Sequence, residues 1–141
     1  KNPNYLQLTK EKMSYDYRVL VVDDNLINTS VAKTLLEQLG FKSCDVAYSG
    51  EEAFALVAAG NEYGLILMDL HMPGMSGIEC TRKILYDLKL QVPIIACSAD
   101  VLTDIRQECG NVGMAGFIEK PYKLEKLKEV IYDILQTKQS A

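Results

Sequence analysis

Five short apolar runs alternate with five segments of helical spacing, and this alternation limits the possible folds more than any other feature. The apolar runs are residues 18–22, 42–48, 64–69, 92–98 and 116–120. The segments after each run carry apolar residues at helical spacing or helix-start signals. They are residues 25–40, 49–59, 76–89, 100–113 and 124–136. Alternating strands and helices require right-handed crossovers, so the pattern predicts an α/β fold with a doubly wound parallel sheet buried on both faces.

Local signals support several of the helices. The segment 25–40 carries six apolar residues at helical spacing and ends at a glycine, which is a typical C-terminal stop. These residues are Leu26, Ile27, Val31, Leu35, Leu36 and Leu39. Ser49 precedes Glu52 by three positions, which is the spacing of a capping box. Gly110 is expected to interrupt the helix predicted over residues 100–113.

Length and charge set broad limits on function. The 141 residues suffice for one domain with a real core, and the net charge of −4 disfavours nucleic-acid binding by the chain. No apolar run approaches the 18 or more residues of a membrane span. The four cysteines form no CxxC pair, so we interpret them as reduced thiols in a cytosolic or nuclear setting.

The two ends of the chain differ from the region between them. Residues 1–16 are polar without a clear period, so we expect a linker or flanking segment there, and residues 138–141 are expected to form a short tail. Because the chain starts with Lys1 rather than Met, we expect it to be a piece of a longer protein.

Polar residues stand at the ends of four predicted strands. Asp23 and Asp24 end the first, Asp69 the third, Ser98 the fourth and Lys120 the fifth. Ligands of open parallel sheets bind beyond the carboxyl ends of the strands, so these side chains are expected to share one edge.

The residue types at this edge indicate a particular chemistry. Three neighbouring carboxylates repel one another unless a cation lies among them. Oxygen ligands without histidine or cysteine at metal spacing favour a hard ion such as Mg²⁺. An ammonium and a hydroxyl added to that ion would suit a phosphoryl group.

Four motifs at these strand ends carry a family resemblance: "VLVVDDN", "LILMDLHMPGMSG", "IIACSAD" and "GFIEKP". Over residues 17–137 the chain resembles the receiver domain of two-component response regulators, and most of all receivers attached to hybrid histidine kinases. The resemblance implies a flavodoxin-like (βα)5 fold, with five parallel strands in the order 2-1-3-4-5.

The resemblance also implies a metal site and a phosphoacceptor. Asp69 would attack phosphorus and become an acyl phosphate. Asp24, Asp69 and the backbone carbonyl of His71 would bind Mg²⁺, and Asp23 would act through a metal-bound water.

Further positions would hold the phosphoryl group and respond to it. Ser98 and Lys120 would contact its oxygens, and the Lys120-Pro121 bond would be cis. Phe117 occupies the switch-aromatic position, and Asp100 lies where residues tune the lifetime of the acyl phosphate.

His71 is the only histidine of the chain. The resemblance gives it a share in tuning that lifetime, and its side chain as a metal ligand or phosphoryl carrier is the alternative. The phosphodonor histidine must therefore come from a histidine kinase or a histidine phosphotransfer domain, either as a separate protein or as part of the same full-length chain.

The implied function is a phosphorelay receiver in the cytoplasm, or in the cytoplasmic part of a larger sensor. It would phosphorylate and dephosphorylate itself, then switch the face formed by residues 100–113, 116–120 and 124–136 or pass the group on. It would contact neither nucleic acid nor membrane.

Other interpretations of the same residues stay open. The polar residues could be plain helix caps or surface charges, and Phe117 could be ordinary core. A Mg²⁺-dependent aspartyl phosphatase of the haloacid-dehalogenase type would need a D-x-D motif, whereas Asp23 and Asp24 are contiguous. A flavin- or nucleotide-binding module would need a phosphate loop in place of these acids. A degenerate receiver acting only as a docking domain would not need the full set of polar residues.

Overall fold

The computed structural model describes the backbone of residues 18–140 and the side chains of residues 18–136. Its strands are β1 (Arg18–Val22), β2 (Ser43–Ala47), β3 (Leu65–Asp69), β4 (Ile94–Ser98) and β5 (Gly116–Glu119). They form one parallel sheet in the order β2-β1-β3-β4-β5. Strand order and direction confirm the predicted flavodoxin-like fold. The linker predicted for residues 1–16 lies outside the described residues.

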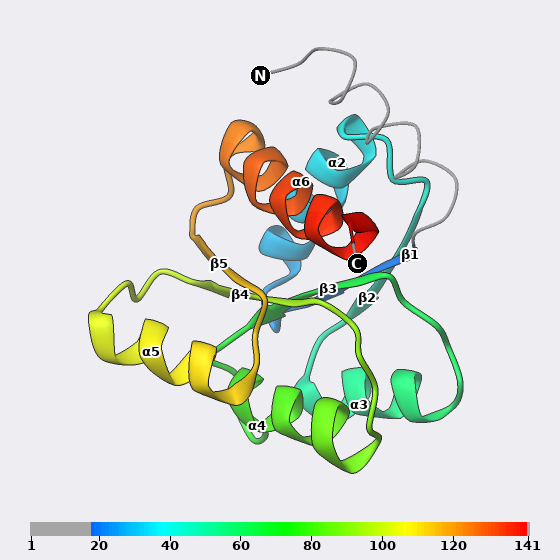
Figure 1. Cartoon of the computed structure of the whole chain (residues 1–141), viewed down its shortest axis with the longest axis vertical. Helices are drawn as coiled ribbons and strands as arrows, with labels where there is room; N and C mark the ends of the chain where they lie inside the picture. Colours follow the sequence, from blue (N-terminus) through cyan, green and yellow to red (C-terminus); the bar gives the residue numbers. More distant parts are fainter. Residues whose placement is uncertain (1–17, 141) are drawn as a thin grey trace.

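Helices cover both faces of the sheet (Figure 1). On one face lie α2 (Leu26–Gln38) and α6 (Leu124–Ser140), and on the other lie α3 (Gly50–Ala58), α4 (Gly77–Arg82) and α5 (Thr103–Val112). Because side chains alternate along a strand, the sheet divides the core into two apolar clusters. Val21 and Leu67 belong to the cluster that includes residues of α2 and α6, and Leu20 and Ile66 belong to the opposite one.

The central and edge strands differ in burial. Every side chain of β3 and β4 is buried, whereas the edge strands β2 and β5 are mostly half-buried. The prediction of strands buried on both faces is therefore right for the centre of the sheet and wrong for its edges, where a neighbouring strand is missing on one side.

Two helix starts follow from their caps. The side chain of Asn25 accepts hydrogen bonds from the N–H groups of Ile27 and Asn28 at 2.9 and 3.0 Å, which starts α2. Ser49 accepts from the N–H of Glu52 at 3.0 Å, and the Glu52 carboxylate accepts from the N–H of Tyr48 at 3.1 Å. This reciprocal pair confirms the expected capping box at α3, with Glu52 reaching one residue further back than usual.

Three helices differ from their predicted form. α4 continues into the π-helical segment η1 (Lys83–Asp87), and α6 runs on to Ser140 rather than ending near residue 136. α5 continues through Gly110, so the predicted interruption is wrong, because a glycine only weakens a helix that keeps its backbone hydrogen bonds. No helix within residues 18–140 combines the length and apolarity that crossing a membrane requires.

The apolar residues of α2 divide between core and surface. Leu36 and, just after the helix, Leu39 are buried against the sheet. Leu26, Ile27 and Val31 instead expose 65%, 73% and 41% of their surface. The start of α2 therefore presents apolar side chains to solvent next to the end of β1.

Candidate functional site

Asp23 and Asp24 follow directly after β1. The N–H of Asp23 donates to the carbonyl of Ala47 at 3.1 Å, which extends the pairing of β1 with β2 by one residue. Its Oδ1 accepts from the N–H of Asn25 at 2.9 Å, and the residue is only 1% exposed. Asp24 is exposed. One carboxylate of the pair is therefore held inside the sheet edge while the other is open to solvent.

Asp69 is the last residue of β3 and is 5% exposed. The chain turns sharply after it, because the N–H of Gly77 donates to the carbonyl of Leu70 at 3.0 Å. A Cβ on Gly77 would lie 2.1 Å from the backbone oxygen of Asp69. Only a glycine lets the start of α4 approach the end of β3 this closely, so Gly77 shapes the loop that carries the site.

Lys120, just after β5, joins the two buried carboxylates. Its Nζ donates to Asp23 Oδ2 at 2.6 Å and to Asp69 Oδ1 at 2.9 Å. Its backbone N–H donates to the carbonyl of Ser98 at 2.9 Å, which fixes the chain beside β4. The Lys120-Pro121 bond is cis, as the resemblance implies.

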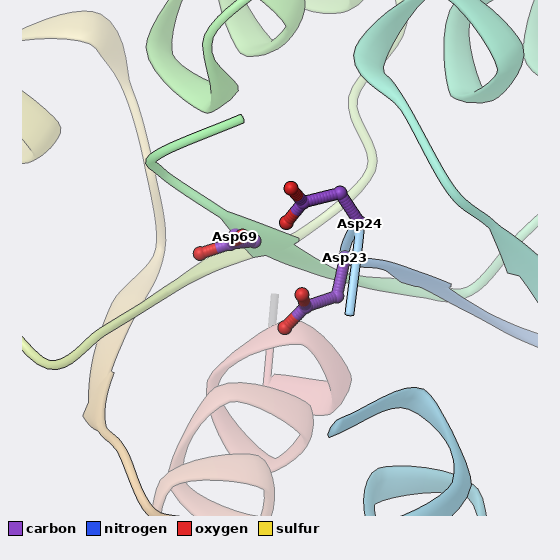
Figure 2. A group of neighbouring side chains, drawn as sticks. All are labelled: Asp23, Asp24 and Asp69. Atoms are coloured by element: carbon purple, nitrogen blue, oxygen red, sulfur yellow. The ribbon is translucent and has the colours of Figure 1, made fainter. Parts of the chain in front are cut away.

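The three carboxylates form one cluster. Each offers an oxygen atom, and these atoms lie within 4.8 Å of one another. Figure 2 shows the side chains reaching from the ends of β1 and β3 toward one shared space. Even with the Lys120 ammonium, three ionised carboxylates leave an excess of two negative charges. An oxygen-only cluster with that excess fits a hard divalent cation such as Mg²⁺.

Burial and hydrogen bonding act in opposite directions on the ionisable groups. Burial raises the pKa of Asp69, although the hydrogen bond from Lys120 and one from the backbone N–H of His71 both lower it. For Lys120, burial disfavours the ammonium, but the hydrogen bonds to Asp23 and Asp69 outweigh burial and raise its pKa. The lysine is therefore firmly charged, and Asp69 is easier to protonate than an ordinary aspartate.

Ser98 and Asp100 lie beside this cluster. Asp69 pairs with Cys97 in the β3–β4 register, so Ser98 stands one residue further along the neighbouring strand, and it is 1% exposed. Its Oγ accepts from the N–H of Asp100 at 2.9 Å, and Asp100 Oδ1 accepts from the N–H of Leu102 at 3.1 Å. These two bonds hold residues 100–102 outside the helix, so α5 begins at Thr103 rather than at residue 100 as predicted.

His71 and Phe117 lie at the margins of the site. The His71 side chain is exposed, and only its backbone N–H contacts the Asp69 carboxylate. Phe117 on β5 pairs with Ala96 on β4 and is half-buried. The guanidinium of Arg106 lies over its ring. The structure thus brings together Asp23, Asp24, Asp69 and Lys120, and it places Phe117 further back along the sheet.

Two residues that matter to this arrangement were not predicted from the sequence. Gly77 follows a serine that caps α4, and only its place after "MPGMS" could have drawn attention to it. Arg106 lies on a polar, exposed helix surface, where spacing alone gives no sign of the aromatic ring beneath it.

Comparison with known proteins decides the family. The family model described as the response regulator receiver domain matches residues 19–132 of this chain. The chain belongs to the response regulator receiver domain family. This is the family of two-component signalling domains that the four sequence motifs indicated.

Individual relatives agree with this assignment. The chain is 36% identical over 125 residues to the osmosensing histidine protein kinase SLN1 of Saccharomyces cerevisiae, covering 86% of this chain and 10% of the kinase. It is 34% identical over 115 residues to the two-component response regulator 24 of Arabidopsis thaliana, covering 82% of this chain and 81% of that protein. Against five histidine-kinase relatives, two of them named as hybrid kinases, the chain spans between 7% and 16% of their length.

A solved receiver has the same fold. The receiver domain of the histidine kinase CKI1 from Arabidopsis thaliana, complexed with Mg²⁺ and BeF3⁻, is 32% identical with a TM-score of 0.76. The match covers 93% of this chain and 97% of that one.

Proposed function

We propose that this receiver takes a phosphoryl group from a phosphohistidine donor onto Asp69, in a reaction that requires Mg²⁺. One observation carries the proposal above all others. The largely buried Lys120 ammonium bridges Asp69 and Asp23 at the carboxyl ends of the strands, where a parallel sheet binds its ligands.

The chain's own residues can perform the transfer. A carboxylate oxygen of Asp69 attacks phosphorus, so an O–P bond forms while the N–P bond to the donor imidazole breaks, and the imidazole takes up a proton from water. Lys120 can turn its ammonium from the carboxylates to the phosphoryl oxygens. Ser98 Oγ already accepts a hydrogen bond from Asp100, so its own proton is available for donation to the same group.

Asp24, Asp69 and the backbone carbonyl of His71 would hold Mg²⁺, with Asp23 acting through a metal-bound water. The ion supplies charge neutralisation for the phosphoryl oxygens. Attack of water on the phosphorus of the acyl phosphate would break the O–P bond, release inorganic phosphate and restore the Asp69 carboxylate. The domain would then dephosphorylate itself without being a turnover enzyme. His71 and Asp100, at the rim of the site, would tune how fast that water reacts.

The output follows from the charge added at Asp69. Phosphorylation brings close to two negative charges and new acceptor oxygens, as it does at other residues. We propose that Ser98 moves toward these oxygens and that Phe117 turns inward behind it. This movement would change the face formed by α5, β5 and α6, or the group would instead pass to a further histidine.

The exposed start of α2 supports a protein partner for the transfer. The chain's only histidine is His71, so the donor histidine belongs to another domain or protein. That partner must reach Asp69, and Leu26 and Ile27 expose 65% and 73% of their surface just after the acidic pair. We propose that a histidine kinase or histidine phosphotransfer domain covers these apolar side chains when it docks.

The proposed receiver domain comprises residues 17–137, with residues 1–16 as a linker, whereas residues 138–140 continue α6 rather than forming the separate tail expected over residues 138–141. We propose that the domain lies in the cytoplasm or in the cytoplasmic part of a larger sensor. We also propose a kinase core in the same full-length chain, because two of the relatives are named hybrid signal transduction histidine kinases.

Phosphorylation by acetyl phosphate in the presence of Mg²⁺ tests the acceptor. Intact-mass measurement should show one phosphoryl group that is lost in base, as an acyl phosphate is. Asp69→Asn should take up none, because an amide is not a nucleophile, whereas Asp100→Asn should still be labelled. A base-stable label, a label on Asp69→Asn, or no label on the wild-type chain from either acetyl phosphate or a phosphohistidine protein would refute the proposal.

A further inference from the structure

A cation–π contact joins α5 to β5. The Cζ atom of Arg106 lies 4.4 Å from the centroid of the Phe117 ring, well inside the distance at which such contacts are attractive. Arg106 is exposed and Phe117 is half-buried, so the guanidinium covers the ring at the border between core and solvent.

The strand register connects this contact to the phosphorylation site. Phe117 pairs with Ala96 on β4, and Glu119 pairs with Ser98. Residues two apart on a strand share a face, so the side chains of Phe117 and Ser98 lie on the same side of the sheet. This is the side covered by α5, where Phe117 packs against the apolar cluster that includes Cys109 and Val112.

Arg106 forms no ion pair with a carboxylate in the described part of the chain, unlike Arg18, which pairs with Asp45. Because Arg106 is exposed, replacing it opens no cavity in the core. Its removal therefore takes away the contact with the ring and one surface charge, and little else.

We propose that Arg106 is a positioning residue that holds Phe117 in its half-exposed orientation and so sets how readily phosphorylation turns the ring inward. The inference rests on the switch proposed above. A contact made only in the unphosphorylated orientation opposes the change, and its loss shifts the equilibrium toward the inward state. A ligand at Asp69 that favours the inward state then binds more tightly.

Affinity for beryllium fluoride with Mg²⁺ measures this shift without phosphorylation chemistry, and an NMR titration can follow it. Arg106→Gln should bind the phosphate mimic about two- to fivefold more tightly than wild type, the factor expected from an exposed cation–π contact. Arg106→Lys keeps a cation and should fall between the two. Loss of a positive charge alone would weaken binding of an anion, so the predicted direction is opposite to the electrostatic one.

Two matched variants separate the contact from other effects. Arg82→Gln removes an exposed arginine of α4 with the same change in net charge, and it should bind no more tightly than wild type. In a Phe117→Leu background, Arg106→Gln should add no further tightening, because the ring is already gone. The Arg106 side-chain protons should also be shifted upfield by the ring in the free wild-type protein and not in Phe117→Leu.

The outcomes distinguish this inference from the proposed function. If wild type and Arg106→Gln both bind the mimic at Asp69 with equal affinity, or the variant binds more weakly, Arg106 does not position the ring and the inference is wrong. If wild type does not bind the mimic at all, the proposed phosphoryl site itself is wrong.

Discussion

Replacing Lys120 by methionine should show how strongly the site depends on this largely buried ammonium. The Nζ atom makes charge-assisted hydrogen bonds of 2.6 and 2.9 Å to Asp23 and Asp69. The side chains of Lys120, Asp23 and Asp69 are 14%, 1% and 7% exposed, so solvent can replace the ammonium only in part. Lys120→Met keeps most of the length of the side chain and leaves two buried carboxylates facing each other.

The magnitude follows from this burial. Breaking a buried ion pair by removing one partner costs about 3–5 kcal/mol, and the site lies at a sheet edge that water can reach. We therefore expect Lys120→Met to lower the unfolding free energy by about 2–4 kcal/mol at pH 7 without Mg²⁺. Chemical denaturation in urea measures it. Lys123→Met, three residues on and exposed, is the control and should change stability by less than about 0.5 kcal/mol.

The stability that Asp69 and Lys120 contribute depends on pH, and the direction follows from their pKa shifts. Burial raises the folded-state pKa of Asp69 above its unfolded value, so the folded state binds more protons between the two values. Stability contributed by this group is therefore lost as pH rises through that window, and losing Lys120 should raise the pKa of Asp69 further. The raised pKa of Lys120 works in the same direction, because the stability from its ammonium is present below its unfolded pKa and is lost only as pH rises through its folded value.

The gap between wild type and Lys120→Met should accordingly shrink in acid, where the carboxylates are neutral, and reach its full size near pH 7. Saturating Mg²⁺ should also narrow it, because a divalent cation offsets the uncompensated carboxylates. A difference below about 0.5 kcal/mol at pH 7, or one that does not change with pH, would show that the ammonium does not stabilise these carboxylates.

Three further substitutions test other parts of the structure. Gly77→Ala should lower the unfolding free energy by about 1–3 kcal/mol in denaturation experiments, because its Cβ would lie 2.1 Å from the backbone oxygen of Asp69; unchanged stability would mean the loop can yield. Ser98→Ala should still bind beryllium fluoride, but NMR shifts across α5, β5 and α6 that appear in wild type should vanish; their persistence would exclude Ser98 from the coupling. Ile27→Ser should leave stability within about 0.5 kcal/mol and slow phosphoryl transfer from a phosphohistidine protein but not from acetyl phosphate, and equal slowing with both donors would place the effect in the site rather than in docking.

Much of the fold was predictable because short local sequence patterns indicate where each strand lies and where it ends. Apolar runs such as residues 65–68 end in a single polar residue, and parallel strands bring such ends to one edge. That argument places Asp69 and Lys120 near each other without any knowledge of side-chain direction. It could not predict that one ammonium bonds both Asp69 and Asp23, because this depends on rotamers and on the exact turn of each loop.

Other features needed the tertiary structure. Helical spacing does not say which arc of α2 faces the sheet, so the exposure of Leu26 and Ile27 could not be predicted. The change from α4 to the π-helical η1 is likewise invisible in a pattern whose apolar spacing suits either helix. The interruption predicted at Gly110 is wrong because a glycine costs a helix only about 1 kcal/mol relative to alanine. The burial of Cys109 and Val112 on the same helix outweighs that cost.

The two-sided sheet has a consequence for how such a chain can change over generations. Leu26 and Ile27 belong to a helix on one face, and Arg106 and Phe117 meet on the other. The four buried apolar residues of β3, residues 65–68, lie between these faces. If Leu26 and Ile27 dock the donor and Arg106 sets the switch, as proposed above, mutations that alter donor recognition and mutations that alter the response fall on separate surfaces. Each property can then change with little effect on the other.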